Sequence, residues 1–320
     1  MVFENIYRSY FDVHFIEKKM KKVDIAMATY NGESFIEAQI FSIIKQNYSN
    51  WCLYISDDAS SDKTVQLIKK MIEIDSRIHL VNTERQGGVI QNFNKALMST
   101  DADYIMISDQ DDLWPENRLE IMIKEMEKRE DGKKNIMLFS DLVLIDEKGN
   151  KIADSFYEAN RLNPFENMKK NRLLWNCTVY GCTTIVNRRL LNTSLPIPAN
   201  ALMHDQWLAL NANRCDGLFY LSDYKTVYYR QHSNNVVGGV SHGYFAKIKN
   251  FKKNIKNINK SVKAIKFNIH GNNGLYSKNN PLLSYFDFLK FALKEIFPEI
   301  IKGDKKVQAL FIFLGFIFSK

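Results

Sequence analysis

The chain has 320 residues, of which 45% are hydrophobic and 25% are charged. This composition belongs to a folded protein that can bury a sizeable core, and it excludes a disordered chain. The formal net charge is +8, but residues 245–306 hold fourteen lysines and four acids, a net charge of +10. The remaining residues therefore carry a net charge of −2. Such a basic region suits nucleic acid or an anionic membrane surface, with a solvated lysine face as the simpler alternative.

The cysteines and the first residues indicate the compartment. Cys52, Cys177, Cys182 and Cys215 form no Cys-x-x-Cys pair and have poor spacing for zinc. We therefore expect reduced core cysteines in a cytoplasmic protein. Residues 1–22 show no secretory signal and are interpreted as a leader before the folded domain.

Between residues 23 and 135, apolar strands alternate with amphipathic helices. Strands are expected at Val23–Ala28, Trp51–Ile55, Ile78–Val81 and Tyr104–Ile107. Helices are expected at Ser34–Gln46, Thr64–Ile74, Val89–Met98 and Glu116–Arg129. This repeated order with short linkers predicts an α/β fold, in which a Rossmann-like, mostly parallel sheet carries helices on both faces.

The rhythm changes after about residue 135. Strand-like segments occur at 136–140, 142–145, Val179–Val186 and Thr226–Tyr229, with Asp146–Asn150 as a hairpin turn. Residues 203–213 have helical spacing. We expect the half formed by residues 136–243 to extend the sheet and cover the site.

Residues 244–320 predict a basic and apolar helical extension. Lys247–Phe267 is a lysine-rich amphipathic helix candidate, and Leu282–Phe297 is rich in aromatic and aliphatic residues. Val307–Phe318 is almost wholly apolar but has only twelve residues, whereas a membrane-spanning helix needs roughly 20. This tail either lies in a membrane interface or packs on the domain.

The acidic segment Asp109-Gln110-Asp111-Asp112 directly follows a predicted buried strand. Three carboxylates so close together repel one another unless a cation or protons compensate. Oxygen ligands of this kind suit Mg²⁺ or Mn²⁺, which proteins commonly share with a diphosphate. The segment therefore predicts a metal–diphosphate site, and an acidic cap on the following helix is the alternative.

Polar residues also follow two neighbouring strands, at Thr29-Tyr30-Asn31 and at Asp57-Asp58. The carboxyl ends of parallel strands open onto one crevice, where ligands bind. Either aspartate could accept a hydrogen bond from a base or a ribose, and Tyr30 could stack on a base. Gly88 precedes a helix whose N-terminus favours an anion. Each motif alone is more often a turn or a cap, but their common placement favours a nucleotide site.

In this order and spacing the motifs resemble those of the family 2 glycosyltransferases of the GT-A type. The likeness covers roughly residues 23–240 and is greatest to bacterial rhamnosyltransferase-like members that build O-antigen and capsule polysaccharides. The resemblance implies a GT-A domain at 23–243, with a nucleotide-binding half (23–135) and an acceptor half (136–243). The matching segments are Thr29–Gly32, Ser56–Asp62, Gly87–Asn94, Asp109–Leu119, His204–Trp207 and Tyr229–Asn235.

The resemblance also implies roles for the matching residues. Asp205 would be the catalytic base, His204 and Trp207 would contact the acceptor, and Asp111 and His232 would bind the metal. The implied contacts to the nucleotide-sugar are Thr29, Tyr30, Asn31, Asp57, Asp58, Gly88, Asn92, Asn94, Asp109, Asp112 and Trp114. Without the resemblance, Asp205 is explained as a helix cap, His232 as a loop histidine and the two tryptophans as core residues.

The implied activity is an inverting transfer of a sugar to a lipid-linked saccharide. Rhamnose is the first expectation for this sugar, and a hexose is the second. It would use dTDP-rhamnose or a UDP-hexose with Mn²⁺ or Mg²⁺. The lysine-rich and apolar C-terminal region, which lies outside the resemblance, fits docking at the inner face of the cytoplasmic membrane, and no nucleic-acid partner is expected. A processive synthase is not expected, because the chain has no Gln-x-x-Arg-Trp motif. The alternatives are a Mg²⁺-dependent nucleotidyltransferase, for which the phosphate-binding P-loop is missing, and a non-catalytic sugar-nucleotide or nucleic-acid binding module.

Overall fold

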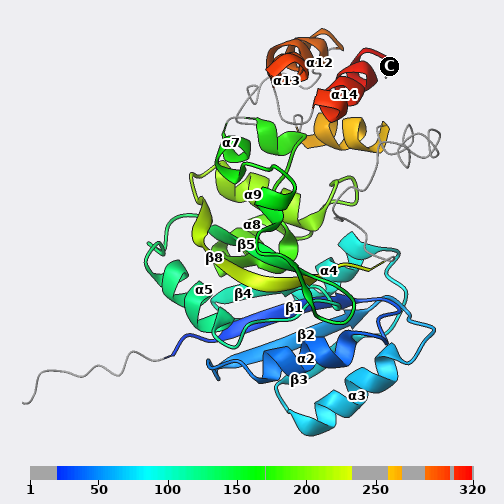
Figure 1. Cartoon of the computed structure of the whole chain (residues 1–320), viewed down its shortest axis with the longest axis vertical. Coiled ribbons are helices and arrows are strands. Elements are labelled where there is room, and N and C mark those ends of the chain that lie inside the picture. The colour runs from blue at the N-terminus through cyan, green and yellow to red at the C-terminus, as the bar shows by residue number, and fades with distance from the viewer. Residues whose placement is uncertain (1–19, 170, 233–258, 269–284, 303–305, 319–320) are drawn as a thin grey trace, which may run out of the picture.

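The computed structural model describes residues 20–169, 171–232, 259–268, 285–302 and 306–318. Most of the predicted leader and of the Lys247–Phe267 helix lies outside these residues. Four parallel strands form one half of a sheet, in the order β3-β2-β1-β4 (Figure 1). They are β1 (Val23–Thr29), β2 (Trp51–Asp57), β3 (Ile78–Asn82) and β4 (Tyr104–Ser108).

Alternation along these strands explains why helices cover both faces of the sheet. Ile25 and Met27 of β1 pack in one hydrophobic cluster, whereas Ala26 packs in the other together with Ile105 and Ile107 of β4. The first cluster includes buried side chains of α2 (Ile36–Ile44), α3 (Thr64–Ile74) and α5 (Arg118–Glu127), and the second those of α4 (Val89–Met98). The predicted α/β fold is therefore confirmed.

The second half of the chain extends the same sheet to eight strands. Strand β7 lies between β4 and β5 and runs antiparallel to both, while β8 pairs with β5 in parallel. The hairpin turn at 146–150 joins β5 to β6 as predicted. These strands are β5 (Met137–Ile145), β6 (Lys151–Ala153), β7 (Thr184–Asn187) and β8 (Leu218–Arg230).

The strands differ from the predicted ones in three places. The prediction over Val179–Val186 is wrong in its first half, because Gly181–Thr183 form the 3₁₀ turn η2 and the strand begins only at Thr184. The segments 136–140 and 142–145 form one strand that continues through an irregularity at Asp141. Strand β8 is also longer than the predicted Thr226–Tyr229, since its pairing with β5 organises residues without strong alternation.

Short helices follow β6 and β7 and cover the α4 side of the sheet. Helix α9 coincides with the predicted helical segment, and its Leu208 and Ala209 are fully buried against this side. Asn187 caps α8 by accepting a hydrogen bond from the Leu190 backbone N–H. The elements are α6 (Phe156–Ala159), α7 (Pro164–Met168), η1 (Arg172–Leu174), α8 (Arg188–Ser194) and α9 (His204–Asn213).

The C-terminal helices form the end of the molecule opposite α3 and β3 (Figure 1). Buried Val262, Phe291 and Phe316 belong to the same hydrophobic cluster as α9, so the described part of the extension packs on the domain. None of the described helices has the length and apolar character that crossing a bilayer requires. Residues 259–268 are helical, followed by α12 (Tyr285–Phe291), the π-helical turn η3 (Ala292–Ile296), α13 (Phe297–Lys302) and α14 (Lys306–Phe318).

Candidate active site

A cavity of about 990 Å³ lies where β1, β2 and β4 end. Ten of the residues singled out in the sequence line it, as the crevice rule for parallel sheets leads one to expect. They are Thr29, Tyr30, Asn31, Asp58, Gly88, Asn92, Asp109, Asp111, His204 and Asp205. The other six, which are not among the lining residues, are Asp57, Asn94, Asp112, Trp114, Trp207 and His232.

Asp58 shapes the wall at the start of α4. Its carboxylate accepts hydrogen bonds from the backbone N–H groups of Gln86, Gly87 (2.9 Å) and Gly88 (3.0 Å). Both glycines have positive φ angles, +91° and +131°, which side-chain-bearing residues rarely adopt. The Gly-Gly pair therefore allows the loop to close over this carboxylate.

Tyr30 and Arg85 form the most exposed part of the same wall. The Tyr30 ring is 46% exposed, and the Arg85 guanidinium lies 5.1 Å from its centre. A flat aromatic surface next to a cation suits a base and an anionic phosphate group. The sequence singled out Tyr30 but not Arg85, whose position just before the Gly-Gly pair was the available signal.

Two polar residues near this wall support the framework. Asp57 is fully buried and accepts hydrogen bonds from the hydroxyls of Thr29 (2.8 Å) and Ser60 (2.6 Å). Asn92 accepts a hydrogen bond from the Ser56 hydroxyl and donates one to the Thr29 carbonyl. These contacts use the polar groups of Asp57 and Asn92 to join the ends of β1 and β2 to α4.

Asn94 ties α4 to the loop that follows α8. Its side chain both donates to the Ile197 carbonyl and accepts from the Ile197 N–H, each at 2.8 Å. Both the oxygen and the nitrogen of the amide are thus bonded to the backbone of Ile197, which does not line the cavity.

Gln110 joins the two loops at the centre of the cavity. Its side-chain oxygen accepts a hydrogen bond from the Tyr30 N–H (2.9 Å), and its amide donates to the Tyr30 carbonyl (3.1 Å). A Cβ atom at Gly32 would lie 2.4 Å from that oxygen, so Gly32 permits this close approach. The sequence contains Gln110 within the acidic motif, but spacing alone gave no reason to assign it this contact.

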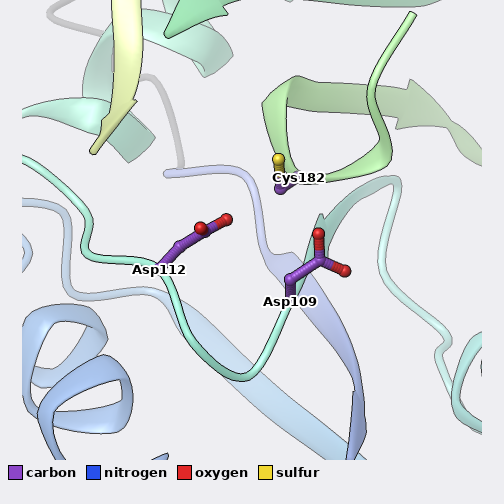
Figure 2. A group of neighbouring side chains, drawn as sticks. All are labelled: Asp109, Asp112 and Cys182. Atoms are coloured by element: carbon purple, nitrogen blue, oxygen red, sulfur yellow. The ribbon is translucent and has the colours of Figure 1, made fainter. Parts of the chain in front are cut away.

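Asp109 and Asp112 lie beside Cys182, which projects from η2. Figure 2 shows the two carboxylates and the sulfur as neighbours, and their ligand atoms lie within 4.8 Å of one another. Burial, then the charges of Asp111 and Asp205, raise the pKa of Asp109 to about 7. Burial, then Asp111 and Asp109, raise the pKa of Asp112 well above its usual range.

This carboxylate pair fits the predicted cation. Asp112 is 1% exposed, and its Oδ2 atom has no hydrogen-bond partner among the described residues. A buried carboxylate oxygen without a partner is costly unless a cation or a proton compensates it. Carboxylate oxygens suit Mg²⁺ and Mn²⁺, whereas the thiol is not a ligand that these hard cations prefer. The sequence interpreted Cys182 as a core residue, and nothing in its spacing indicated this contact.

Strand β8 brings His232 to Asp111. The imidazole Nε2 lies 2.8 Å from Asp111 Oδ2, although 121 positions separate the residues in the chain. The ring also packs on Phe35, with 4.8 Å between ring centroids. Arg230 at the end of β8 fixes the acidic loop by donating from Nε to the Asp111 carbonyl (2.9 Å). The two predicted metal ligands therefore lie side by side.

Asp205 enters the cavity from the first turn of α9. Its carboxylate accepts hydrogen bonds from the backbone N–H groups of Gly181 (3.1 Å) and Gln206 (2.6 Å). A Cβ atom at Gly181 would lie 2.6 Å from the Nε2 atom of His204, so a side chain there would displace the imidazole. Gly181 therefore positions the predicted base, a role that an isolated glycine in an apolar segment did not indicate.

His204 is 3% exposed and stacks on Phe93, with ring centroids 4.0 Å apart. Neither ring nitrogen has a hydrogen-bond partner among the described residues. Burial lowers the pKa of the imidazole, which favours its neutral form. A neutral histidine on the cavity wall can donate one hydrogen bond and accept another.

The two tryptophans that were singled out contact other parts of the protein. Trp114 is 4% exposed, and the Arg118 guanidinium lies 4.1 Å from its ring centre. The Trp207 indole N–H donates to the Ser194 carbonyl, and its ring stacks near Phe267 of the C-terminal extension. Trp114 is therefore a buried core residue, which is the alternative given for it in the sequence. Trp207 joins α9 to the extension.

Comparisons with proteins of known sequence place the chain among sugar transferases. It is 37% identical over 172 residues to the UDP-Glc:alpha-D-GlcNAc-diphosphoundecaprenol beta-1,3-glucosyltransferase WfgD of Escherichia coli, covering 53% of this chain and 62% of that enzyme. The chain thus spans less than two thirds of that relative. It is 28% identical over 227 residues to the dTDP-rhamnosyl transferase RfbG of Shigella flexneri, covering 66% and 73%.

Solved structures share the fold at low sequence identity. Residues 1–349 of TarS from S. aureus superpose with a TM-score of 0.58 at 16% identity, covering 92% of this chain and 80% of that one. The mannosyltransferase PcManGT of Pyrobaculum calidifontis, in complex with GDP-Man and Mn²⁺, gives 0.55 at 15%, covering 100% and 94%. The model of glycosyl transferase family 2 matches residues 24–195, just over half of the chain. The chain therefore belongs to glycosyl transferase family 2 and is a glycosyltransferase.

Proposed function

We propose that this protein transfers a sugar, with inversion, from a pyrimidine-nucleotide diphosphate donor to a lipid-linked saccharide in surface polysaccharide synthesis. One observation carries the proposal: Asp58, the acidic loop after β4 and Asp205 all face one cavity of about 990 Å³. Such a volume is at the upper end of ligand sites in proteins and suits a nucleotide-sugar together with part of an acceptor.

The donor nucleotide lies against Tyr30, Asp58 and the N-terminus of α4 in this proposal. The aromatic face of Tyr30 receives the base, and Arg85 beside it contributes positive charge. Asp58 accepts from the pyrimidine N3–H, which uracil and thymine share. The donor is therefore dTDP-rhamnose or a UDP-hexose, and the activities for which RfbG and WfgD are named support one each.

Asp205 acts as the catalytic base on the acceptor side. An acceptor hydroxyl has a pKa far above 7 and needs a base as it attacks the anomeric carbon. The N–H groups of Gly181 and Gln206 fix the carboxylate, so it receives the proton without first reorienting. A single displacement of this kind inverts the anomeric centre. His204, with two ring nitrogens that lack protein partners among the described residues, is placed to hold the acceptor.

Asp111 and His232 would hold the divalent ion, with Asp109 and Asp112 beside it. A Mn²⁺ or Mg²⁺ ion bound there would supply positive charge to stabilise the departing nucleoside diphosphate. The chain keeps these ligands in place through Arg230, which bonds the Asp111 carbonyl, and through Gln110, which bonds Tyr30. The positions of the residues around the ion would therefore depend on both β8 and the loop after β1.

The acceptor assignment rests on the relatives and on the basic C-terminal region. WfgD is named for a diphosphoundecaprenol acceptor, and such a lipid keeps its saccharide at a membrane surface. We therefore place the protein at the inner face of the cytoplasmic membrane as a peripheral protein, since membranes there attract lysine-rich segments.

A thermal-shift panel tests the donor and the metal together. UDP-glucose, dTDP-rhamnose and GDP-mannose are each added with Mn²⁺ or with EDTA. A bound donor at about 100 times its Kd adds roughly 2.7 kcal/mol, which raises the Tm by several degrees. We expect this rise for one pyrimidine donor with Mn²⁺, and its loss in Asp111→Asn but not in the surface control Asp103→Asn.

Two results would overturn the proposal. One is an equal shift for GDP-mannose and the pyrimidine donors, because Asp58 would then not read the base. The other is an unchanged shift in EDTA, because the acidic loop would then bind no ion that matters to the donor.

A further inference from the structure

Apolar side chains line the solvent face of the C-terminal helices. Leu293, Phe297 and Ile301 are spaced four residues apart along η3 and α13 and are 51%, 43% and 58% exposed. The opposite face of the same segment is buried, with Phe291 and Ile296 in the core. Residues four apart share one face of a helix, so the three side chains form a stripe.

Helix α14 widens this stripe into a patch. The Phe297 ring lies 5.5 Å from the ring of Phe313, which joins the two helices at this face. Leu310, one turn before Phe313, is 40% exposed, and Phe311 is 42% exposed. We call the five exposed side chains Leu293, Phe297, Ile301, Leu310 and Phe311 the apical patch, because the helices form one end of the molecule (Figure 1).

Three exposed lysines lie beside the apical patch, whereas the acidic residues of the same segment, Asp287, Glu295 and Glu299, are only partly exposed. Lys290 and Lys294 are exposed and lie on the stripe's side of the helix, and Lys306 is exposed at the start of α14. The acidic Glu299 of α13 instead pairs with Arg172 of η1 at 2.8 Å, with a side chain only 22% exposed. Apolar side chains flanked by lysines match the interface of an anionic bilayer, where apolar groups enter the acyl boundary and lysines reach the headgroups.

A short helix connects the apical end to the cavity. Lys260 and Ser261 line the cavity, and Lys266 of the same helix lies over the rings of Phe288 in α12 and Phe316 in α14. Six residues of α-helix rise about 9 Å. The C-terminal helices therefore lie next to the acceptor side of the cavity.

From this arrangement we infer that the apical patch docks on an anionic lipid bilayer, so that the cavity faces an acceptor whose lipid remains in the membrane. The reason for docking rests on the proposed function, but docking itself can be measured without any sugar transfer. The apolar residues supply insertion, and the lysines supply attraction to anionic headgroups.

Vesicle sedimentation with the full chain tests this inference. The probes are vesicles of phosphatidylglycerol with phosphatidylcholine, and vesicles of phosphatidylcholine alone. We expect binding to the anionic vesicles that weakens with added salt. The double variant Lys290→Gln/Lys294→Gln should weaken binding by roughly thirtyfold at low salt, and Leu293→Gln/Phe297→Gln by about tenfold or more.

Matched controls come from helices far from the apical patch. Ile74→Gln and Met98→Gln change apolar side chains that are 62% and 64% exposed on or next to α3 and α4. Lys69→Gln/Lys70→Gln removes two exposed lysines of α3. These variants should bind anionic vesicles as tightly as the unaltered protein, and all variants should keep its Tm in the absence of lipid.

The inference is overturned if the unaltered protein fails to bind anionic vesicles. It is also overturned if the patch variants bind as tightly as the controls, since residues outside the described ranges would then provide the contact. The donor-induced thermal shift separates these results from a failure of the proposed function, because the patch variants should retain that shift in full.

Discussion

Asp205 is held by backbone groups from two elements, and this makes its chemistry separable from donor binding. The Gly181 and Gln206 N–H groups fix the carboxylate at the cavity wall. An amide in its place keeps nearly the same shape and still offers its one oxygen to one of these two N–H groups, which bond different oxygens of the carboxylate. It cannot take a proton from an acceptor hydroxyl.

The substitution Asp205→Asn should therefore abolish transfer and leave donor binding intact. We expect kcat for sugar transfer to fall by about 10²–10⁴-fold, the usual contribution of a general base. The donor-induced rise in Tm should match that of the unaltered protein. Asp223→Asn, at an exposed position of β8, is the control and should change neither quantity. Retained transfer in Asp205→Asn would remove Asp205 from the base role.

At the scale of elements, Arg118 joins three parts of the molecule that meet at the site. This fully buried residue begins α5, and its guanidinium donates to the carbonyls of Thr226 in β8 (2.8 Å) and Cys182 in η2. Burial lowers the pKa of Arg118 to about 9. Through these bonds α5 fixes the segment that carries Cys182 and strand β8, which ends two residues before His232.

Replacing Arg118 by methionine should cost far more stability than the same change at Arg129, which lies in the turn after the C-terminal end of α5. Arg118→Met leaves two buried carbonyls without donors, and we expect a loss of about 3 kcal/mol in the free energy of unfolding. Arg129→Met removes a half-buried pair with Glu125 and should cost about 0.5 kcal/mol. Urea unfolding measures both. Similar losses would mean that the Arg118 hydrogen bonds contribute little.

The elements of the first half were predictable to within a few residues, because their periodicity is strong. Helices α3 and α4 have the predicted bounds, and β4 differs by one residue. The antiparallel position of β7 was not predictable, since it depends on the partners of Ile185 and Val186 in β4 and β5. An apolar segment shows that it is buried but not which strands it joins.

The residues of the candidate site also fall into a group that the sequence indicated and a group that it did not. Residues at strand ends, such as Tyr30, Asp58 and Asp109, were found because chain order alone places them at one edge of a parallel sheet. Gly181, Gln110 and Cys182 were not, because their roles depend on contacts between segments far apart in the chain. A glycine reveals its function only when the neighbouring atoms that a side chain would meet are known.

Considered as a whole molecule, the described residues form one sheet with a hydrophobic cluster on each face. The cluster on the α4 side extends from Ala26 in β1 to Phe316 in α14. The C-terminal helices also pair with the domain through Arg172 and Glu299. We expect them to unfold together with the sheet, as one cooperative unit.

The variant Phe291→Ala tests this cooperation. Phe291 is 2% exposed in α12, and truncating such a side chain costs about 3–5 kcal/mol. A single thermal transition at lower temperature is expected, both by circular dichroism and by tryptophan fluorescence. The exposed Phe297→Ala is the matched control and should leave the Tm nearly unchanged. Two separate transitions would show instead that the extension is an independent unit.

The Gln110 side chain has a consequence for how ligands communicate. Gln110 bonds both the N–H and the carbonyl of Tyr30. A movement of Tyr30 therefore also moves Gln110 and, with it, the neighbouring Asp109 and Asp111. Whatever orders one of these loops lowers the entropic cost of ordering the other. If nucleotide and ion bind as proposed, thermodynamic reciprocity requires each to raise the affinity of the protein for the other by the same factor.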